Sequence, residues 1–114
     1  MTISHAGWSD VEAAIRHLDG MAHTEVSIAA EADGPYMGIG GGPNRYFVSI
    51  WTSEERNLIL TDPSQDESQI RLVVGGQAAA YPCRHTVAIE DAVEAAKIYF
   101  RTQSPDPGHV WADG

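Results

Sequence analysis

In the stretch Tyr46-Phe47-Val48-Ser49-Ile50-Trp51, branched and aromatic side chains fall on alternate positions, and a polar turn at Ser53-Glu54-Glu55 follows. This period of two predicts a β-strand, because successive side chains of a strand point to opposite faces of the sheet. Similar short runs lie on both sides of it, at residues 26–30, 36–40, 58–60 and 70–74, with a last one at 86–89. Short runs separated by turn residues predict an antiparallel meander of about five to six strands.

A helix is predicted on each side of this meander. Ser9-Asp10-Val11-Glu12 has the spacing of a capping box, which predicts a helix over about residues 10–19 that ends before Gly20. A second helix is predicted over residues 90–102, with acidic residues in its first turn and basic residues in its last, and with Val93, Ala96 and Phe100 as its buried stripe. The expected fold is a single α+β domain over residues 1–114, in which the N-terminal and C-terminal helices pack on one face of a single curved antiparallel sheet, and Trp111 returns to the body.

Composition and charge argue against a nucleic-acid-binding protein and against a membrane protein. The chain has 114 residues, one cysteine and a formal net charge of -9. An acidic protein of this kind is unsuited to binding nucleic acid, which requires Lys and Arg, and no apolar run is long enough to cross a membrane. The charge weakly favours a basic protein partner, although acidic residues also keep proteins soluble. Without a signal peptide or a possible disulfide, we expect a cytoplasmic protein.

The most specific sign of chemistry is a partial zinc-deaminase signature. Those enzymes combine H-x-E with a later P-C-x-x-C, and this chain has His23-Thr24-Glu25 and Pro82-Cys83-Arg84-His85-Thr86. Threonine stands in place of the second cysteine and is a poor zinc ligand, so we interpret Cys83 as a lone buried cysteine. No two histidines have the i, i+4 spacing of a metalloprotease helix. We therefore expect no catalytic residue, no metal and no cofactor, and not an enzyme.

Two glycine-rich segments are interpreted as turns. Gly38-Ile39-Gly40-Gly41-Gly42-Pro43 lacks the third glycine of a dinucleotide loop and is followed by a strand, which indicates a tight hairpin instead. Gly75-Gly76 indicates a strand end that needs positive φ.

The order of these segments resembles an immunity-protein family of bacterial polymorphic-toxin systems, whose members are often encoded beside nucleic-acid deaminase toxins. The resemblance covers about residues 38–111. It rests on the following segments: Gly40-Gly41-Gly42 before Arg45-Tyr46-Phe47-Val48, Leu58-Ile59-Leu60 before an acidic loop, Leu72-Val73-Val74-Gly75-Gly76-Gln77, Tyr81-Pro82, the Asp91–Phe100 helix and Trp111. The resemblance implies a small inhibitor that binds a cognate toxin domain with a basic surface, as a monomer in a 1:1 complex, and blocks its active site or substrate groove.

We place the toxin-binding surface at the edge of the meander. The expected contact residues are an aromatic anchor with an acidic rim: Trp51, Glu54, Glu55, Asp62, Asp66, Glu67 and Tyr81. A core position for Trp51 is the competing interpretation. The alternative functions are a regulatory module that binds a non-toxin protein and, less favoured, a small hydrolase or deaminase-like enzyme.

Overall fold

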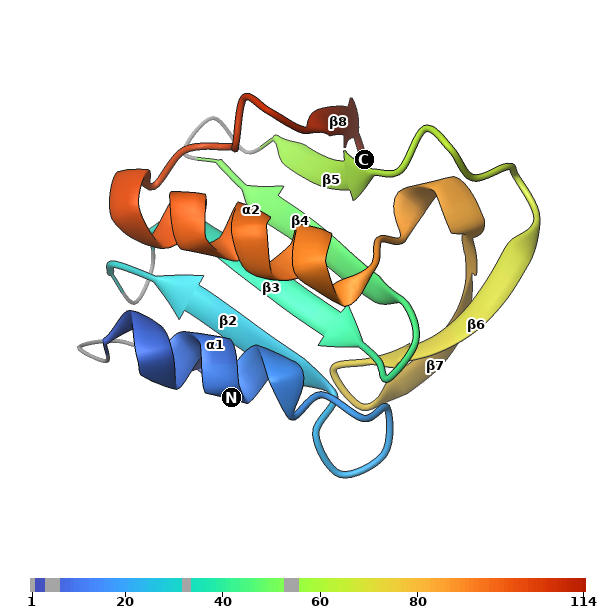
Figure 1. Ribbon diagram of the computed structural model, residues 1–114, viewed down its shortest axis with the longest axis horizontal. Helices are drawn as coiled ribbons and strands as arrows, with labels where there is room; N and C mark the ends of the chain where they lie inside the picture. Colours follow the sequence, from blue (N-terminus) through green and yellow to red (C-terminus); the bar gives the residue numbers. More distant parts are fainter. Residues whose placement is uncertain (1, 4–6, 32–33, 53–55) are drawn as a thin grey trace.

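The structure is a computed structural model that describes residues 2–3, 7–31, 34–52 and 56–114 (Figure 1). The elements follow one another in the order β1 (Thr2–Ile3), α1 (Trp8–Arg16), β2 (Glu25–Ala29), β3 (Tyr36–Gly41), β4 (Tyr46–Trp51), β5 (Asn57–Thr61), β6 (Gln69–Val74), β7 (Gln77–Pro82), a 3₁₀ turn (Cys83–His85), α2 (Ile89–Thr102) and β8 (Val110–Asp113). The predicted α+β class is confirmed.

The strands divide into two sheets. One contains six strands in the order β1-β2-β3-β4-β5-β8, and β6 pairs only with β7 in a two-stranded sheet. The strands β2 to β5 form the predicted antiparallel meander, to which β8 adds antiparallel and β1 parallel. The expectation that residues 70–74 continue this sheet is wrong, because β8 occupies the edge of β5 that β6 would need.

Besides the two-residue β1, two strands are not predicted from the sequence. The strand β7 contains Ala78–Ala80, which lacks the branched and aromatic side chains typical of strands, and becomes a strand because the Gly75-Gly76 turn folds it back on β6. The other is β8, which contains Trp111, the residue expected to pack back onto the body of the domain. The strand expected at 86–89 is reduced to one bridge between Val87 and Tyr46, because α2 begins immediately afterwards.

Both helices cover the same face of the large sheet and lie side by side, as predicted (Figure 1). On α2, Val93, Ala96 and Tyr99 are buried, whereas Phe100, expected in the buried stripe, is half-buried and packs on Trp8 with ring centroids 5.8 Å apart. The core between the helices and the sheet consists of one continuous cluster of apolar side chains: Val11, Ile15, Leu18, Val26, Ile28, Met37, Ile39, Tyr46, Val48, Ile50, Leu60, Val87, Ala92, Val93, Ala95, Ala96 and Tyr99.

The first helix begins and ends earlier than its sequence pattern predicts. Its N-cap is Gly7, whose backbone N–H donates to the Asp10 carboxylate at 3.2 Å, so the predicted Ser9–Glu12 capping box is wrong. The earlier start includes Trp8 in the helix, where it meets α2. The helix ends at Arg16 because the carboxylate of Asp19 accepts the backbone N–H groups of Met21 and His23 and stabilises a loop.

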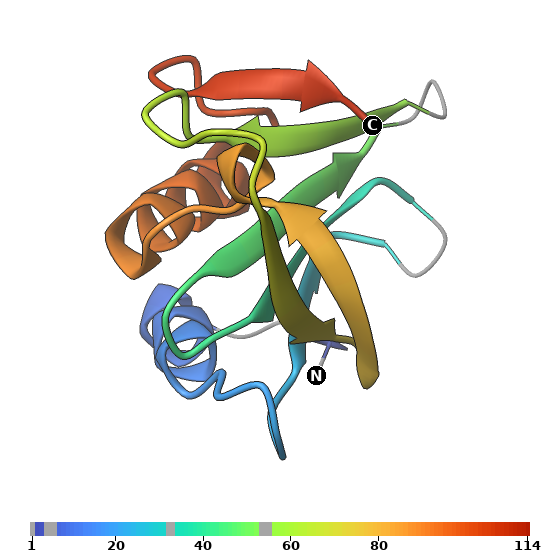
Figure 2. The same cartoon turned by 90° about the vertical axis from the view of Figure 1, so that its right-hand side faces the viewer.

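The glycine turns have the predicted conformations. Gly41, the last residue of β3, and Gly42 after it have φ of 94° and 85°, and Gly75 and Gly76, between β6 and β7, have φ of 58° and 81°. At Gly40 the requirement is space, since a Cβ there would lie 2.4 Å from Cγ1 of Val74. This close approach seats the β6–β7 hairpin against the end of the large sheet where β3 joins β4 (Figure 2).

Candidate functional site

The face of the large sheet opposite the helices is called the outer face here. Its side chains alternate along each strand with those of the core, so Phe47, Ser49 and Trp51 of β4 lie on it while Tyr46, Val48 and Ile50 face the helices. No helix covers the outer face within the described part of the chain (Figure 2). It is therefore the face on which a partner would meet the sheet directly.

The β6–β7 hairpin covers one end of the outer face. Val74 lies over Gly40, and Leu72 lies close to Gly41. Tyr81 of β7 packs on Phe47 of β4 with ring centroids 4.7 Å apart. This packing makes Tyr81 half-buried, so only part of this predicted contact residue is available to a partner.

The opposite end of the outer face carries two exposed aromatic side chains. Tyr36 of β3 and Trp51 of β4 are direct cross-strand partners, and they are 37% and 40% exposed. Neighbouring aromatic side chains on adjacent strands stabilise each other and form one amphipathic contact surface. The structure places Trp51 at the surface and rules out its interpretation as a core residue. It also adds Tyr36, which sequence reasoning missed although its alternation with the buried Met37 was a usable signal.

Small residues and one carboxylate separate this aromatic pair from the hairpin. Ser27, Gly38 and Ser49 pair across three adjacent strands, and a Cβ at Gly38 would lie 3.9 Å from Oε1 of Glu25. Gly75 of the hairpin turn is closer to that carboxylate, since a Cβ there would lie 3.1 Å from Oε2 of Glu25. The centre of the outer face is thus lined by small residues and by the side chain of Glu25.

The carboxylate of Asp62, a predicted contact residue, forms hydrogen bonds within the protein. Its carboxylate accepts hydrogen bonds from the hydroxyl and backbone N–H of Ser64 at 2.6 and 3.0 Å and from Nη2 of Arg45 at 3.0 Å. These bonds, first those of the Ser64 hydroxyl and then those of Arg45, hold the pKa of Asp62 below its ordinary value against the effect of burial. Arg45 also donates to the hydroxyl and carbonyl oxygens of Thr86. Asp62 therefore ties β5 to the segment before α2.

Of the other predicted acidic residues, the described ones, Asp66 and Glu67, do not join Trp51 in one patch. Asp66 accepts the backbone N–H of Ser68 at 2.9 Å, and Glu67 forms an ion pair with Arg84 at 2.8 Å. Trp51 pairs with the first residue of β5, whereas the acidic loop follows the last, about 13 Å further along the strand. The expectation that these segments adjoin is wrong, because the connections before and after one strand leave from opposite ends of the sheet. Glu54 and Glu55 lie outside the described residues.

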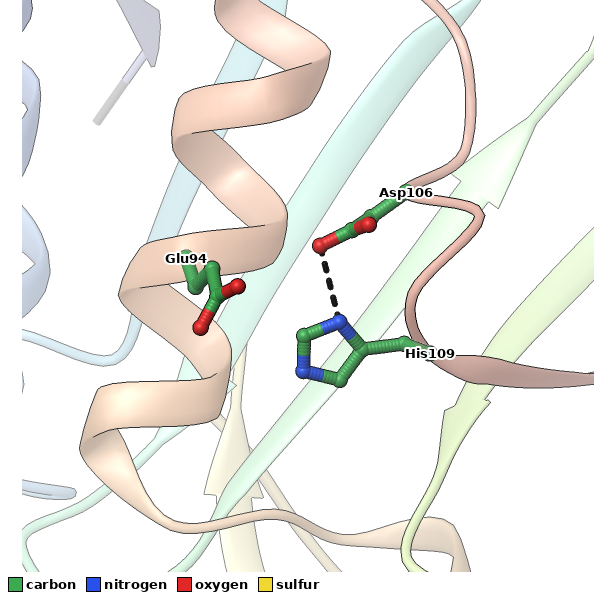
Figure 3. Close-up of side chains that lie close together, drawn as sticks. All are labelled: Glu94, Asp106 and His109. Carbon is green, nitrogen blue, oxygen red and sulfur yellow. Dashed lines mark hydrogen bonds and ion pairs between the residues drawn. The ribbon is translucent and has the colours of Figure 1, made fainter.

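A second group of polar side chains lies between α2 and the loop that leads to β8 (Figure 3). Nδ1 of His109 is 2.8 Å from Oδ2 of Asp106, and Nε2 is 3.4 Å from Oδ1 of Asp91. Burial disfavours the charged imidazolium, but the hydrogen bonds to Asp106 and then Asp91 outweigh it and raise the pKa of His109 above its ordinary value. Asp106 is 5% exposed, its other carboxylate oxygen accepts the N–H of Gly108, and its carbonyl accepts Nε1–H of Trp111.

A cleft of about 780 Å³ lies beside α1. Two histidines border it, His17 and His23, with ring centroids 6.3 Å apart in an edge-on arrangement. The spacing of these histidines in the sequence does not predict their approach, which results from the loop after α1. The remaining lining comes from α1, that loop, the start of β2 and the hairpin turn: Asp10, Ala13, Ala14, Leu18, Ala22, Thr24, Glu25, Val26, Gly75 and Gly76.

The partial deaminase signature is not assembled in space. Thr24, next to His23, bonds to the closed end of the β6–β7 hairpin through Gly75 and Gly76, whereas Cys83 follows its open end. A strand of six residues separates the two ends, which corresponds to about 20 Å. Cys83 lies in the 3₁₀ turn and is half-buried rather than buried as expected.

Comparisons with known proteins complete the description of the site. A family model described as Immunity protein Imm1 matches residues 2–111, which is nearly the whole chain. No curated protein matches the sequence. In the parts of the chain that the structure describes, neither helix has the length and apolar character needed to span a bilayer.

Proposed function

Because the chain belongs to the Imm1 immunity protein family, we propose that it neutralises a cognate toxin domain by binding it through the outer face of the sheet. Family membership supports the toxin-neutralising role itself. The exposed pair Tyr36 and Trp51 is the observation that favours this surface, because aromatic side chains that become desolvated at the centre of an interface supply most of its binding energy.

The toxin in this proposal is a deaminase that acts on nucleic acid. An enzyme of that class presents a basic surface to its substrate, and a chain with a formal net charge of -9 is complementary to such a surface. Four of its basic side chains, those of Arg16, Arg45, Arg56 and Arg84, are already paired with carboxylates of the same molecule. The surplus of negative charge therefore remains for a partner.

Inhibition in this proposal is stoichiometric and takes place in the cytoplasm of the producing cell. One immunity protein covers the active site or substrate groove of one toxin domain, and no bond is made or broken. The aromatic pair Tyr36 and Trp51 fills an apolar depression of the toxin.

The test uses the toxin domain encoded beside the gene for this chain. Co-expression should restore growth, and titration calorimetry of the purified proteins should give a 1:1 complex whose association weakens as salt is added. Full protection by far less than one equivalent of the chain would contradict the binding mechanism and favour enzymatic inactivation of the toxin. A toxin that leaves nucleic acid unmodified would contradict the proposed class of partner while leaving the inhibitory role intact.

A further inference from the structure

The cluster between α2 and the C-terminal loop has the composition of a metal site. Among the described residues, Glu94, Asp106 and His109 each bring one ligand atom to within 4.8 Å of the others. Figure 3 shows that the carboxylate of Glu94 on α2 points toward the imidazole of His109 and the carboxylate of Asp106, which come from the loop before β8. Asp91, one turn before Glu94 on α2, contacts the other nitrogen of the same imidazole.

The charges of this cluster are unbalanced in favour of a cation. Three carboxylates, those of Asp91, Glu94 and Asp106, surround one imidazole, and the side chain of Asp106 is only 8% exposed. Removing a carboxylate from water is costly unless a cation or several hydrogen bonds stabilise it. The imidazole of His109, with Nδ1 2.8 Å from Oδ2 of Asp106, is the basic group of this cluster. A divalent ion at the same place would offset more of the carboxylate charge than one imidazole can.

The ligand types point to a particular class of metal. An imidazole nitrogen with carboxylate oxygens suits Zn²⁺ and its first-row neighbours, whereas Mg²⁺ and Ca²⁺ prefer oxygen ligands alone. Bonds of about 2.0–2.2 Å to a tetrahedral zinc place neighbouring ligand atoms about 3.3 Å apart. Glu94 is exposed, so its side chain is free to bring its carboxylate closer to the ligand atoms of Asp106 and His109. Asp106 is fixed by the N–H of Gly108 and needs to move little.

We propose that Glu94, Asp106 and His109 form a zinc-class site that fastens the C-terminal segment to α2. Binding replaces the proton shared by His109 and Asp106 with the metal ion, and that proton is released to solvent. Water completes the coordination, and Asp91 stays beside the imidazole. The fastened loop carries Trp111, whose indole N–H already donates to the carbonyl of Asp106. The sequence indicates no metal because Cys83, His85 and His23 are its apparent ligands, and none of these three belongs to the cluster.

The test is titration calorimetry of the tag-free protein with zinc chloride and, separately, with magnesium chloride. The informative variant is Glu94→Gln. Glu94 is exposed, and glutamine removes the negative charge while keeping the size of the side chain. Glu90→Gln on the same helix is the matched control. We expect saturable 1:1 zinc binding by the wild type and the control, and binding weakened about tenfold or more in Glu94→Gln and His109→Gln. Magnesium should bind at least ten times more weakly than zinc to the wild type.

Thermal melts separate a lost ligand from a damaged fold. In the presence of a chelator, Glu94→Gln should melt at the temperature of the wild type, and added zinc should raise the melting temperature of the wild type and of Glu90→Gln only. Zinc binding of equal strength in Glu94→Gln, absence of saturation in the wild type, or equally tight magnesium binding would each overturn the proposal. A loss of binding in His23→Gln but not in Glu94→Gln would overturn it too and would move the site to the cleft beside α1.

Discussion

Replacing Trp51 by alanine should weaken toxin binding while leaving the fold intact. Trp51 is 40% exposed, and a large aromatic side chain presents about 250 Å² in total, so about 100 Å² is available to a partner. At about 25 cal/mol per Å² of buried apolar area, losing this contact corresponds to about 2.5 kcal/mol, or about a 70-fold higher Kd. Most of the change should be faster dissociation, because an anchor residue acts after the encounter.

The assay combines surface plasmon resonance against the toxin domain with thermal melts of the free variants. Met21→Ala is the matched control, since Met21 is 86% exposed but lies in the loop after α1, near the other end of the sheet. It should leave Kd unchanged, and Tyr36→Ala should weaken binding in the same direction as Trp51→Ala. A folded Trp51→Ala protein with wild-type Kd would refute the placement of the interface. If Trp51→Ala instead lowers the free energy of unfolding by about 3–5 kcal/mol, the cost typical of truncating a buried tryptophan, Trp51 acts mainly in folding.

Three other perturbations test the fold and the charge argument. Gly40→Ala should lower the free energy of unfolding by about 1–3 kcal/mol, measured in urea, because its Cβ would collide with the β6–β7 hairpin; unchanged stability would contradict this packing. Asp62→Asn should cost about 1–2 kcal/mol at pH 7 through the weakened bond to Arg45. The pKa of Asp62 is lowered by folding, so this stabilisation is complete above the unfolded pKa of about 3.9 and is lost as the pH falls through the folded pKa. Urea melts from pH 7 to pH 2 should therefore converge for the two proteins, and parallel curves would contradict the assignment. Charge reversal of Glu54 and Glu55 together should mainly slow association with the toxin and reduce its salt dependence, and an unchanged association rate in stopped-flow measurements would exclude them from the rim.

The candidate site was only partly predictable from the sequence. Alternation in residues 46–51 identified a strand with Trp51 on the face opposite Val48 and Ile50, but not whether another segment covered that face. The bond between Asp62 and Arg45 was not predictable, because Arg45 lies 17 residues earlier in the chain. An ion pair between residues so far apart depends on the pairing of β4 with β5 and on the position of the segment before α2, and neither is encoded in local spacing.

Patterns within short stretches of the sequence account for the individual helices, strands and turns of this protein. A period of two, glycine at the turns and charge at the helix ends act within a few residues, so the meander, the second helix and the two hairpin turns could be read directly. The tertiary structure decided which segments meet. The free edge of β5 pairs with β8 and not with β6. The helix α1 begins early enough for Trp8 to contact Phe100. The imidazole of His109 lies between the carboxylates of Asp91 and Asp106. Each of these contacts joins segments that are far apart in the chain. Its free energy therefore depends on the packing of the whole domain and cannot be inferred from local sequence patterns.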